Sequence, residues 1–250
     1  MTKRDEFVSV IQNEFETDRL TIQNTLPTFH PESAEEAARL FRLANQHEQQ
    51  VYITGFGNNI DPVGEKFVGL IIVRTDRLNQ LIEINPQDLY VTAGAGYPLR
   101  ELNHHLLKQK LFVPHGQLPY VGSVGGAIAV GLSARHMGHD LPLKRYFLKA
   151  EIVTPEGEII TPGSVCFKSA SGYDVVKVFA GSWGLLGLVV SATIRVMPDT
   201  ALDEYELLSQ NETNREAFLA GLAKSNVSHD AVYARKIKQK FDPRAVLPIV

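Results

Sequence analysis

Cysteine is almost absent from this chain of 250 residues, which has a single cysteine, Cys166. One thiol cannot form an intrachain disulfide, and it cannot supply the ligands of a zinc ribbon or an iron–sulfur cluster. This cysteine usage fits a reducing compartment, so we expect a cytoplasmic protein. Because Val165 and Phe167 flank Cys166, we interpret it as a small buried hydrophobic side chain rather than a reactive thiol.

Long hydrophobic runs and a strong excess of one charge are also missing. The longest apolar stretches, such as residues 124–132 and 185–190, are far shorter than the roughly 20 residues that a bilayer-spanning helix needs. We therefore expect no membrane span, and the acidic N-terminal residues are unlike a secretion signal. The formal net charge is only -3, which gives no electrostatic reason to expect nucleic acid as a partner.

Local patterns predict several short elements. Apolar residues recur at helical spacing after Ser33, and a capping box of Ser33 and Glu36 predicts a helix that runs to about His47. β-Branched runs predict strands at 51–54 and 68–73, on either side of a glycine-bearing loop. Turn-forming residues predict two hairpins, with strands at 81–84 and 89–93 around residues 85–88, and at 150–153 and 158–161 around residues 154–157.

The remaining patterns complete a mixed fold. They predict helices at 98–110, 173–179, 214–224 and 230–240, a strand at 188–196, and an extended segment held by Pro114 and Pro119. These helices and strands do not alternate regularly along the chain. The sequence therefore predicts an α+β fold rather than a doubly wound parallel sheet.

The loop Gly55-Phe56-Gly57-Asn58-Asn59 follows a predicted strand. Glycine and asparagine tolerate positive φ, so successive backbone N–H groups can turn inward and bind a pyrophosphate. The fingerprint G-x-G-x-x-G is not matched, because Ile60 stands where its last glycine would be and no helix follows; a Rossmann domain is disfavoured. An ordinary turn between two strands is the alternative.

A second stretch, residues 122–133, is rich in glycine, alanine and serine. Small side chains let a flat ligand approach the backbone and receive N–H donors at its polar edge. Tight packing of a strand or helix is the alternative interpretation of the same composition.

Five segments together resemble the FAD-binding (PCMH-type) domain of the vanillyl-alcohol oxidase and p-cresol methylhydroxylase family, and more narrowly the FAD subunits of bacterial glycolate oxidase. The matching segments are residues 54–59, 91–96, 122–133, 168–174 and 181–189. The resemblance implies a two-subdomain PCMH-type FAD-binding fold at residues 1–198, with subdomains at about 1–76 and 77–198. Residues 199–250 would form a short helical remnant, so the cap domain of most relatives is expected to be largely absent.

The resemblance also implies which residues bind FAD. The first loop would wrap the pyrophosphate, the run 122–133 would follow the pyrophosphate and flavin ring, and residues 187–189 would meet the adenine part through backbone atoms. The expected cofactor-binding residues are Gly55, Phe56, Gly57, Asn58, Asn59, Pro114, Ser123, Val124, Gly125, Gly126, Ser133, Gly187 and Val189. The first loop has no histidine for covalent attachment, so the FAD is expected to be non-covalent.

The implied activity is that of an FAD-dependent dehydrogenase subunit, which takes a hydride from a small hydroxy acid or alcohol. A partner subunit or an oligomer would then cover the flavin. One alternative is a non-catalytic flavin-binding or assembly module that needs a partner, and another is a flavin-free interaction protein that kept only the scaffold. No catalytic base can be assigned from the sequence.

Histidines gather near residues 135–140, with His115 upstream, so a metal site has to be weighed. His136 and His139 are three residues apart, but no helix is predicted that would place both on one face. We expect no metal; solvated loop residues, or a positive charge near the flavin, are the alternatives. Trp183 is interpreted as a packing anchor rather than a stacking platform.

Overall fold

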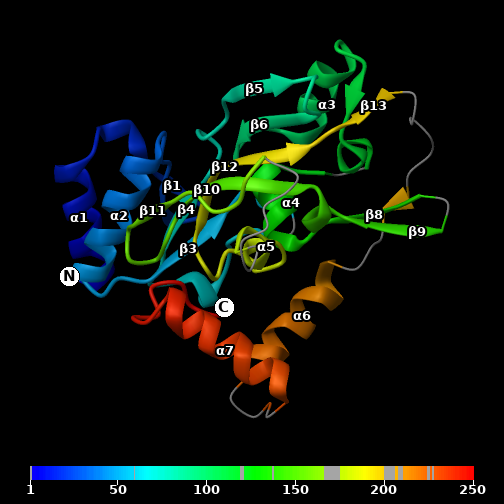
Figure 1. Ribbon diagram of the computed structural model, residues 1–250. Helices are drawn as coiled ribbons and strands as arrows, with labels where there is room; N and C mark the ends of the chain where they lie inside the picture. Colours follow the sequence, from blue (N-terminus) through cyan, green and yellow to red (C-terminus); the bar gives the residue numbers. More distant parts are fainter. Residues whose placement is uncertain are drawn as a thin grey trace.

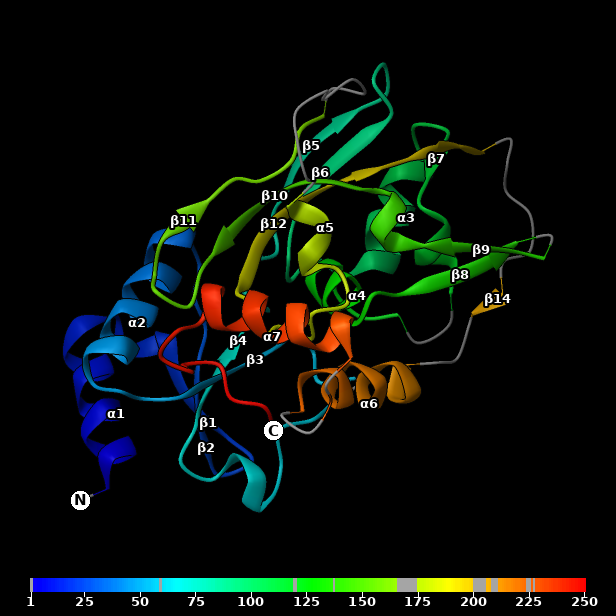
Figure 2. The same ribbon diagram turned by 60° about the horizontal axis from the view of Figure 1, so that its bottom comes forward.

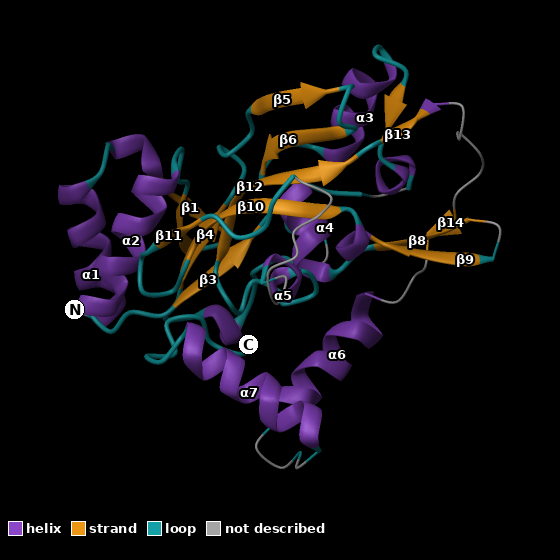
Figure 3. Ribbon diagram, viewed as in Figure 1, coloured by secondary structure: helices purple, strands orange, loops and turns teal. Residues whose placement is uncertain are grey.

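The computed structural model describes residues 2–58, 60–118, 121–136, 138–165, 175–199, 206–207, 211–223, 226 and 228–250. Two β-sheets form the centre of the molecule, and helices pack around them (Figure 1). Helices and strands do not alternate regularly along the chain (Figure 3), which confirms the predicted α+β class. Among the described helices, none is long and apolar enough to cross a membrane.

The first sheet has four strands in the order β1-β2-β4-β3. Their bounds are Leu20–Gln23 for β1, Leu26–Phe29 for β2, Val51–Thr54 for β3 and Ile71–Arg74 for β4. β1 and β2 form an antiparallel hairpin, whereas β4 runs parallel to both β2 and β3. In this register Thr54 pairs with Arg74, so both strands end at the same edge of the sheet.

Helices α1 (Lys3–Glu14) and α2 (Ala34–Gln46) share a buried core with the first sheet. The predicted capping box of α2 forms only in part. Ser33 Oγ accepts a hydrogen bond from the N–H of Glu36 at 3.2 Å, as expected for an N-cap. The Glu36 carboxylate instead accepts from the backbone N–H of Glu32 and from the guanidinium of Arg19.

The second sheet has five strands in the order β11-β10-β12-β6-β5, all paired antiparallel. Their bounds are Leu81–Asn85 for β5, Tyr90–Gly94 for β6, Phe147–Val153 for β10, Ile159–Ile160 for β11 and Leu188–Arg195 for β12. Helices α3 (Leu99–Leu107), α4 (Val124–Val130) and α5 (Val176–Phe179) contribute buried side chains to the same core as this sheet. Both predicted hairpins and the strand near residue 190 are confirmed.

Short strands and two C-terminal helices complete the described chain. The strands are β7 (Leu111–Phe112) with β13 (Met197–Pro198), and β8 (Ser133–His136) with β9 (His139–Pro142) and β14 (Glu206–Leu207). Helices α6 (Asn211–Leu222) and α7 (His229–Phe241) lie side by side, next to α4 and α5 (Figure 2). Beyond α7 the chain returns to the first sheet, where the N–H of Val51 donates to the carbonyl of Val246 at 2.9 Å.

Several predicted bounds are wrong, and backbone conformation explains why. The strand expected at 68–73 begins only at Ile71, because Gly69 has φ +97° and follows a 3-10 turn. The helix expected at 98–110 spans 99–107, with Lys110 at φ +59°. The segment that begins at Pro114 is a 3-10 turn at 114–117 rather than extended chain. In the helix expected at 173–179, the described residues are helical only from Val176.

Candidate functional site

A cavity of about 560 Å³ opens between the end of β3 and the start of α4. This volume lies within the range of about 300–1,000 Å³ that is usual for small-molecule and cofactor sites. Its walls come from β3 and the loop after it, from the segment around α4, and from residues 179–189. The cavity therefore lies where the two sheet regions meet.

The loop after β3 forms one wall. Its carbonyl at Phe56 accepts a hydrogen bond of 2.7 Å from the guanidinium of Arg74, and Gly57 has φ +84°. Among the residues that the structure describes, none accepts a hydrogen bond from the backbone N–H groups of residues 55–58. Backbone N–H groups rarely stay unpaired, so four successive ones beside a cavity can serve an anionic ligand.

Ser123 faces this loop from the start of α4. Its hydroxyl oxygen accepts from the N–H of Gly126 at 3.1 Å and caps the helix. A Cβ on Gly55 would lie 2.9 Å from that oxygen, and a Cβ on Gly126 would lie 3.1 Å from it. Glycine at both positions therefore keeps the space around Ser123 free of side chains.

The first N–H groups of α4 are already used within the protein. The N–H of Val124 donates to the Tyr97 carbonyl at 2.9 Å, and the N–H of Gly125 donates to the Ala95 carbonyl at 2.8 Å. A Cβ on Gly125 would lie 2.7 Å from the Cβ of Ala95, so this glycine is required by helix packing. The run 122–133 thus combines close packing with small residues along the cavity, rather than a row of free donors.

The third wall contains Gly187, whose φ is +152° and whose added Cβ would lie 2.7 Å from the Val153 carbonyl. Gly184 has φ +75° and packs against Ile53 of β3. Trp183 also lines the cavity, and it packs against the core of the second sheet as the sequence predicted. Positions 184 and 187 need glycine, because at 187 a side chain would collide with backbone and at 184 it would be strained by the positive φ.

The structure brings most of the expected cofactor-binding residues to this one cavity. Those that line it are Gly55, Phe56, Gly57, Asn58, Ser123, Gly125, Gly126, Gly187 and Val189. Val124 is fully buried in the core, Pro114 is buried in a 3-10 turn, and Ser133 lies on β8; none of these three lines the cavity. Asn59 and the segment 168–174 lie outside the described residues.

Sequence reasoning missed other lining residues, among them Tyr52, Thr75 and Leu118. The alternation of β3 could have pointed to Tyr52, because residues 52 and 54 lie on the same face of a strand. Burial raises the pKa of Tyr52, while the charge of Arg215 opposes that rise. Thr75 directly follows β4, and its N–H donates to the Thr54 carbonyl at 3.1 Å, which ties it to the start of the loop.

His115 lies in the core rather than at the cavity. Its Nε2 is 2.7 Å from the Leu141 carbonyl, and burial lowers its pKa to about 4, against the effect of this hydrogen bond. Among the described residues, no three His, Cys, Asp or Glu side chains gather in an arrangement that could hold a metal ion. His136 has no described side chain, so its part in the predicted histidine group lies outside the structure.

Comparison with known proteins identifies the class of domain. The family described as "FAD binding domain" matches residues 26–163, more than half of the chain. The chain therefore belongs to this family, and the predicted resemblance is confirmed.

The chain is also similar to part of several curated proteins. The chain is 28% identical over 171 residues to a D-lactate dehydrogenase of Archaeoglobus fulgidus, covering 67% of this chain and 38% of that protein. It is 26% identical over 172 residues to the glycolate oxidase subunit GlcD of Bacillus subtilis, covering 67% and 36%. A D-2-hydroxyglutarate dehydrogenase of Xanthomonas citri is 28% identical over 178 residues, covering 69% and 37%. The chain thus spans less than two fifths of the length of these relatives.

A solved structure shares the fold. Alkyldihydroxyacetonephosphate synthase superposes with a TM-score of 0.60 at 20% identity, and the match covers 78% of this chain and 40% of that one. This likeness supports the architecture of the FAD-binding domain and nothing finer.

The cavity fits FAD, the cofactor of this family, on its own geometry. A diphosphate needs donors without side-chain obstruction. The loop at 55–58 offers N–H groups that have no acceptor in the described part of the chain, and glycines 55 and 126 keep the space opposite them open. A flat ring system needs apolar walls, and Leu118, Val121 and Leu132 supply them in the same cavity.

Proposed function

We propose that this chain is the FAD-binding part of an oxidoreductase that takes a hydride from a small hydroxy acid or alcohol. The observation that carries the proposal is the cavity between β3 and α4, with a row of N–H groups at residues 55–58 that find no acceptor among the described residues. The substrate class is supported by the relatives, whose names include a D-lactate dehydrogenase, a glycolate oxidase subunit and a D-2-hydroxyglutarate dehydrogenase. All three names refer to 2-hydroxy acids.

In this proposal the loop at 55–58 binds the pyrophosphate, and the Ser123 hydroxyl, which can still donate its proton, lies opposite. Gly187 and Val189 pack against the adenine part. Bound FAD would supply the hydride acceptor, while the protein supplies position and a shaped environment. No described side chain is assigned as catalytic base.

We further propose that the FAD is held without a covalent bond and that a partner subunit or a second copy of the chain covers its reactive face. Hydride transfer needs a water-poor site around the flavin, which supports such a cover. Acid precipitation of the loaded protein should leave the yellow flavin in the supernatant. Flavin that stays with the pellet would contradict non-covalent binding.

A direct test begins with the purified chain and FAD. We expect saturable binding, seen as quenching of flavin fluorescence, and then bleaching of the flavin absorbance by anaerobic D-lactate, glycolate or D-2-hydroxyglutarate. Absence of any FAD binding would overturn the proposal. Binding without bleaching by any of the three, alone or with a co-purifying partner, would favour the non-catalytic flavin-binding module instead.

A matched pair of glycines tests the location of the site. Gly57 and Gly64 both have φ +84°, but only Gly57 lines the cavity. Alanine at either position suffers the same backbone strain, about 1–2 kcal/mol. We expect Gly57→Ala to weaken FAD binding by about tenfold, because the strained alanine moves the loop out of its binding conformation. Tenfold in affinity corresponds to about 1.4 kcal/mol of binding free energy. Gly64→Ala should bind FAD as the unchanged protein does; equal losses in both variants would remove the loop from the site.

A further inference from the structure

Arg74 is the last residue of β4, next to the strand that leads into the cavity loop. One guanidinium nitrogen donates to the Phe56 carbonyl at 2.7 Å, and the other donates to the side-chain oxygen of Gln23 on β1. A Cβ on Gly57 would lie 3.9 Å from the first of these nitrogens. Arg74 therefore joins the loop to the first sheet at the point where the loop turns.

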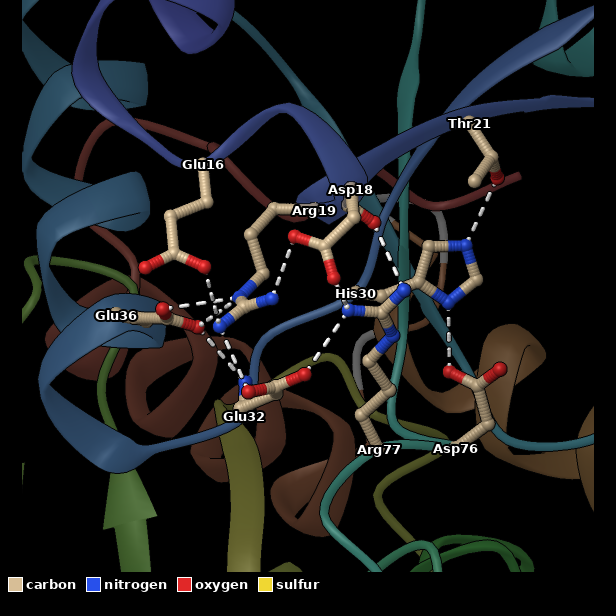
Figure 4. Close-up of polar contacts among 9 residues, drawn as sticks. All are labelled: Glu16, Asp18, Arg19, Thr21, His30, Glu32, Glu36, Asp76 and Arg77. Atoms are coloured by element: carbon tan, nitrogen blue, oxygen red, sulfur yellow. Dashed lines mark hydrogen bonds and ion pairs between the residues drawn. The ribbon is translucent and has the colours of Figure 1, made fainter.

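Gln23 is itself held in one orientation. Its amide nitrogen lies 3.4 Å from Nε2 of His30. The hydroxyl of Thr21 lies 2.9 Å from the same Nε2 atom of His30. Nδ1 of His30 lies 2.7 Å from the Asp76 carboxylate (Figure 4). Because a guanidinium can only donate, the Gln23 amide turns its oxygen toward Arg74 and its nitrogen toward His30.

This arrangement fixes a peptide unit of the loop. The chain has no cis peptide bond among its described residues. In a trans peptide the C=O of Phe56 and the N–H of Gly57 point in opposite directions, so a carbonyl held by Arg74 keeps that N–H directed away from the guanidinium. The N–H is then available on the other side of the loop.

Arg74 also differs from two other arginines of this region, Arg19 and Arg77, in its ion pairs. Arg19 forms ion pairs with Asp18, Glu32 and Glu36, and Arg77 forms ion pairs with Asp18 and Glu32 (Figure 4). Within the part of the chain that the structure describes, no carboxylate lies within ion-pair distance of Arg74. A cation without a carboxylate partner, placed against an anion-binding loop, matches the charge of a diphosphate.

We propose that Arg74 is a positioning residue for the diphosphate of the nucleotide: it orients the Phe56–Gly57 peptide and its positive charge raises the affinity for the dianionic group. This inference rests on the proposed binding of FAD in the cavity. It extends the site to a residue that belongs to none of the sequence segments expected to bind the cofactor.

The test compares the unchanged protein and four variants in their affinity for FAD and for ADP, which carries the diphosphate without the flavin. Arg74→Gln should weaken the binding of both ligands by about tenfold, because the loop loses the bond that orients its peptide and the site loses a nearby positive charge. Arg74→Lys, which keeps the charge but not the two-pronged geometry, should recover part of that loss. Affinity should also fall less steeply with salt in Arg74→Gln than in the unchanged protein.

Arg77→Gln is the matched control. It lies three residues further along the chain and changes the net charge by the same amount, but its guanidinium is already paired with carboxylates. It should keep the affinity for FAD and ADP. Equal losses in Arg74→Gln and Arg77→Gln, or no loss in Arg74→Gln, would overturn the inference. If the unchanged protein binds no FAD, the proposed function fails, which is a separate outcome.

Gln23→Glu separates charge from geometry and does not depend on the stability of the arginine variants. A glutamate here keeps an acceptor for Arg74 but neutralises its charge. Measured well below the melting temperature of the apoprotein, the binding of FAD and ADP should weaken by about tenfold. An unchanged affinity in this variant would show that the charge of Arg74 plays no part and would overturn that half of the inference.

Discussion

At the residue scale, His115 shows how burial alone sets a charge state. The imidazole is fully buried, its Nδ1 has no hydrogen-bond partner among the described residues, and its ring lies edge-on to Tyr146 at a centroid distance of 5.2 Å. Burial lowers its pKa from 6.5 to about 4, so the folded protein keeps His115 neutral. The unfolded chain, in contrast, binds a proton at this residue at moderately acidic pH.

The first prediction is that His115 makes the protein less stable in acid. Between pH 6.5 and pH 4 the unfolded chain holds the proton and the folded chain does not, so stability falls as the pH falls through this window. The loss should be about 3 kcal/mol at the acid end. His115→Gln, which can donate to the same carbonyl but cannot be protonated, should show a correspondingly smaller loss in urea unfolding at pH 7 and pH 4.

The exposed His104 on α3 provides the control, because His104→Gln also removes one histidine. That variant should lose as much stability between pH 7 and pH 4 as the unchanged protein. An equal acid loss in His115→Gln and in the unchanged protein would rule out the buried imidazole as its source.

At the scale of elements, Asn103 joins α3 to the chain that follows it. Its amide nitrogen donates to the Val113 carbonyl at 2.9 Å, and its amide oxygen accepts from the Val113 N–H at 2.7 Å. The side chain is 2% exposed. A Cβ on Gly116 would lie 2.5 Å from the Asn103 nitrogen, so glycine at 116 permits this close contact.

We predict that Asn103→Ala lowers the free energy of unfolding by about 1–3 kcal/mol, because the Val113 N–H would stay buried without an acceptor and the Val113 carbonyl would keep only the N–H of Gly116. Chemical denaturation measures the loss. Gln109→Ala, at an exposed position just beyond the same helix, should change stability by less than about 0.5 kcal/mol. Comparable losses in the two variants would contradict the bridging role of Asn103.

Elements set by local chemistry could be predicted from the sequence. The turn at residues 85–88 forms because Asn85 accepts from the N–H groups of Gln87 and Asp88 within the turn itself. Helix α4 could not be predicted, since Gly, Ala and Ser carry no amphipathic pattern. Its start is fixed by carbonyls of Ala95 and Tyr97, which no local rule places beside it.

The candidate site divides in the same way. The glycine loop at 55–58 has a pattern of its own, and the structure places it at the cavity. Arg74 and Thr75 reach it only because β3 and β4 pair in parallel across a connection of sixteen residues, and sequence patterns do not give strand register across such a distance. Residues whose role depends on pairing partners were therefore missed.

At the scale of the whole molecule, the C-terminal segment ties the two sheet regions together. Phe241 of α7 packs edge-on against Phe179, which lines the cavity, at a centroid distance of 5.3 Å. A few residues later, Val246 and Leu247 are buried in the core of the first sheet. The segment expected to be a remnant in place of a cap thus contributes to the core.

Asp242 controls this return of the chain. Its buried carboxylate accepts from the N–H groups of Val246 at 2.8 Å and Leu247 at 3.0 Å, and it pairs with Lys238. Asp242→Ala would leave two backbone donors without their acceptor, and the partly buried Lys238 ammonium would keep only the Leu247 carbonyl.

The last prediction is that Asp242→Ala lowers the free energy of unfolding by about 3 kcal/mol and weakens FAD binding as well, because release of the tail loosens the contact of α7 with Phe179. Asp242→Asn keeps one acceptor oxygen and should lose less of both. Asp230→Ala, at an exposed position near the start of α7, should change each by less than about 1 kcal/mol. If Asp242→Ala lost stability while its FAD affinity, measured well below its melting temperature, stayed unchanged, α7 would support the fold without shaping the cavity.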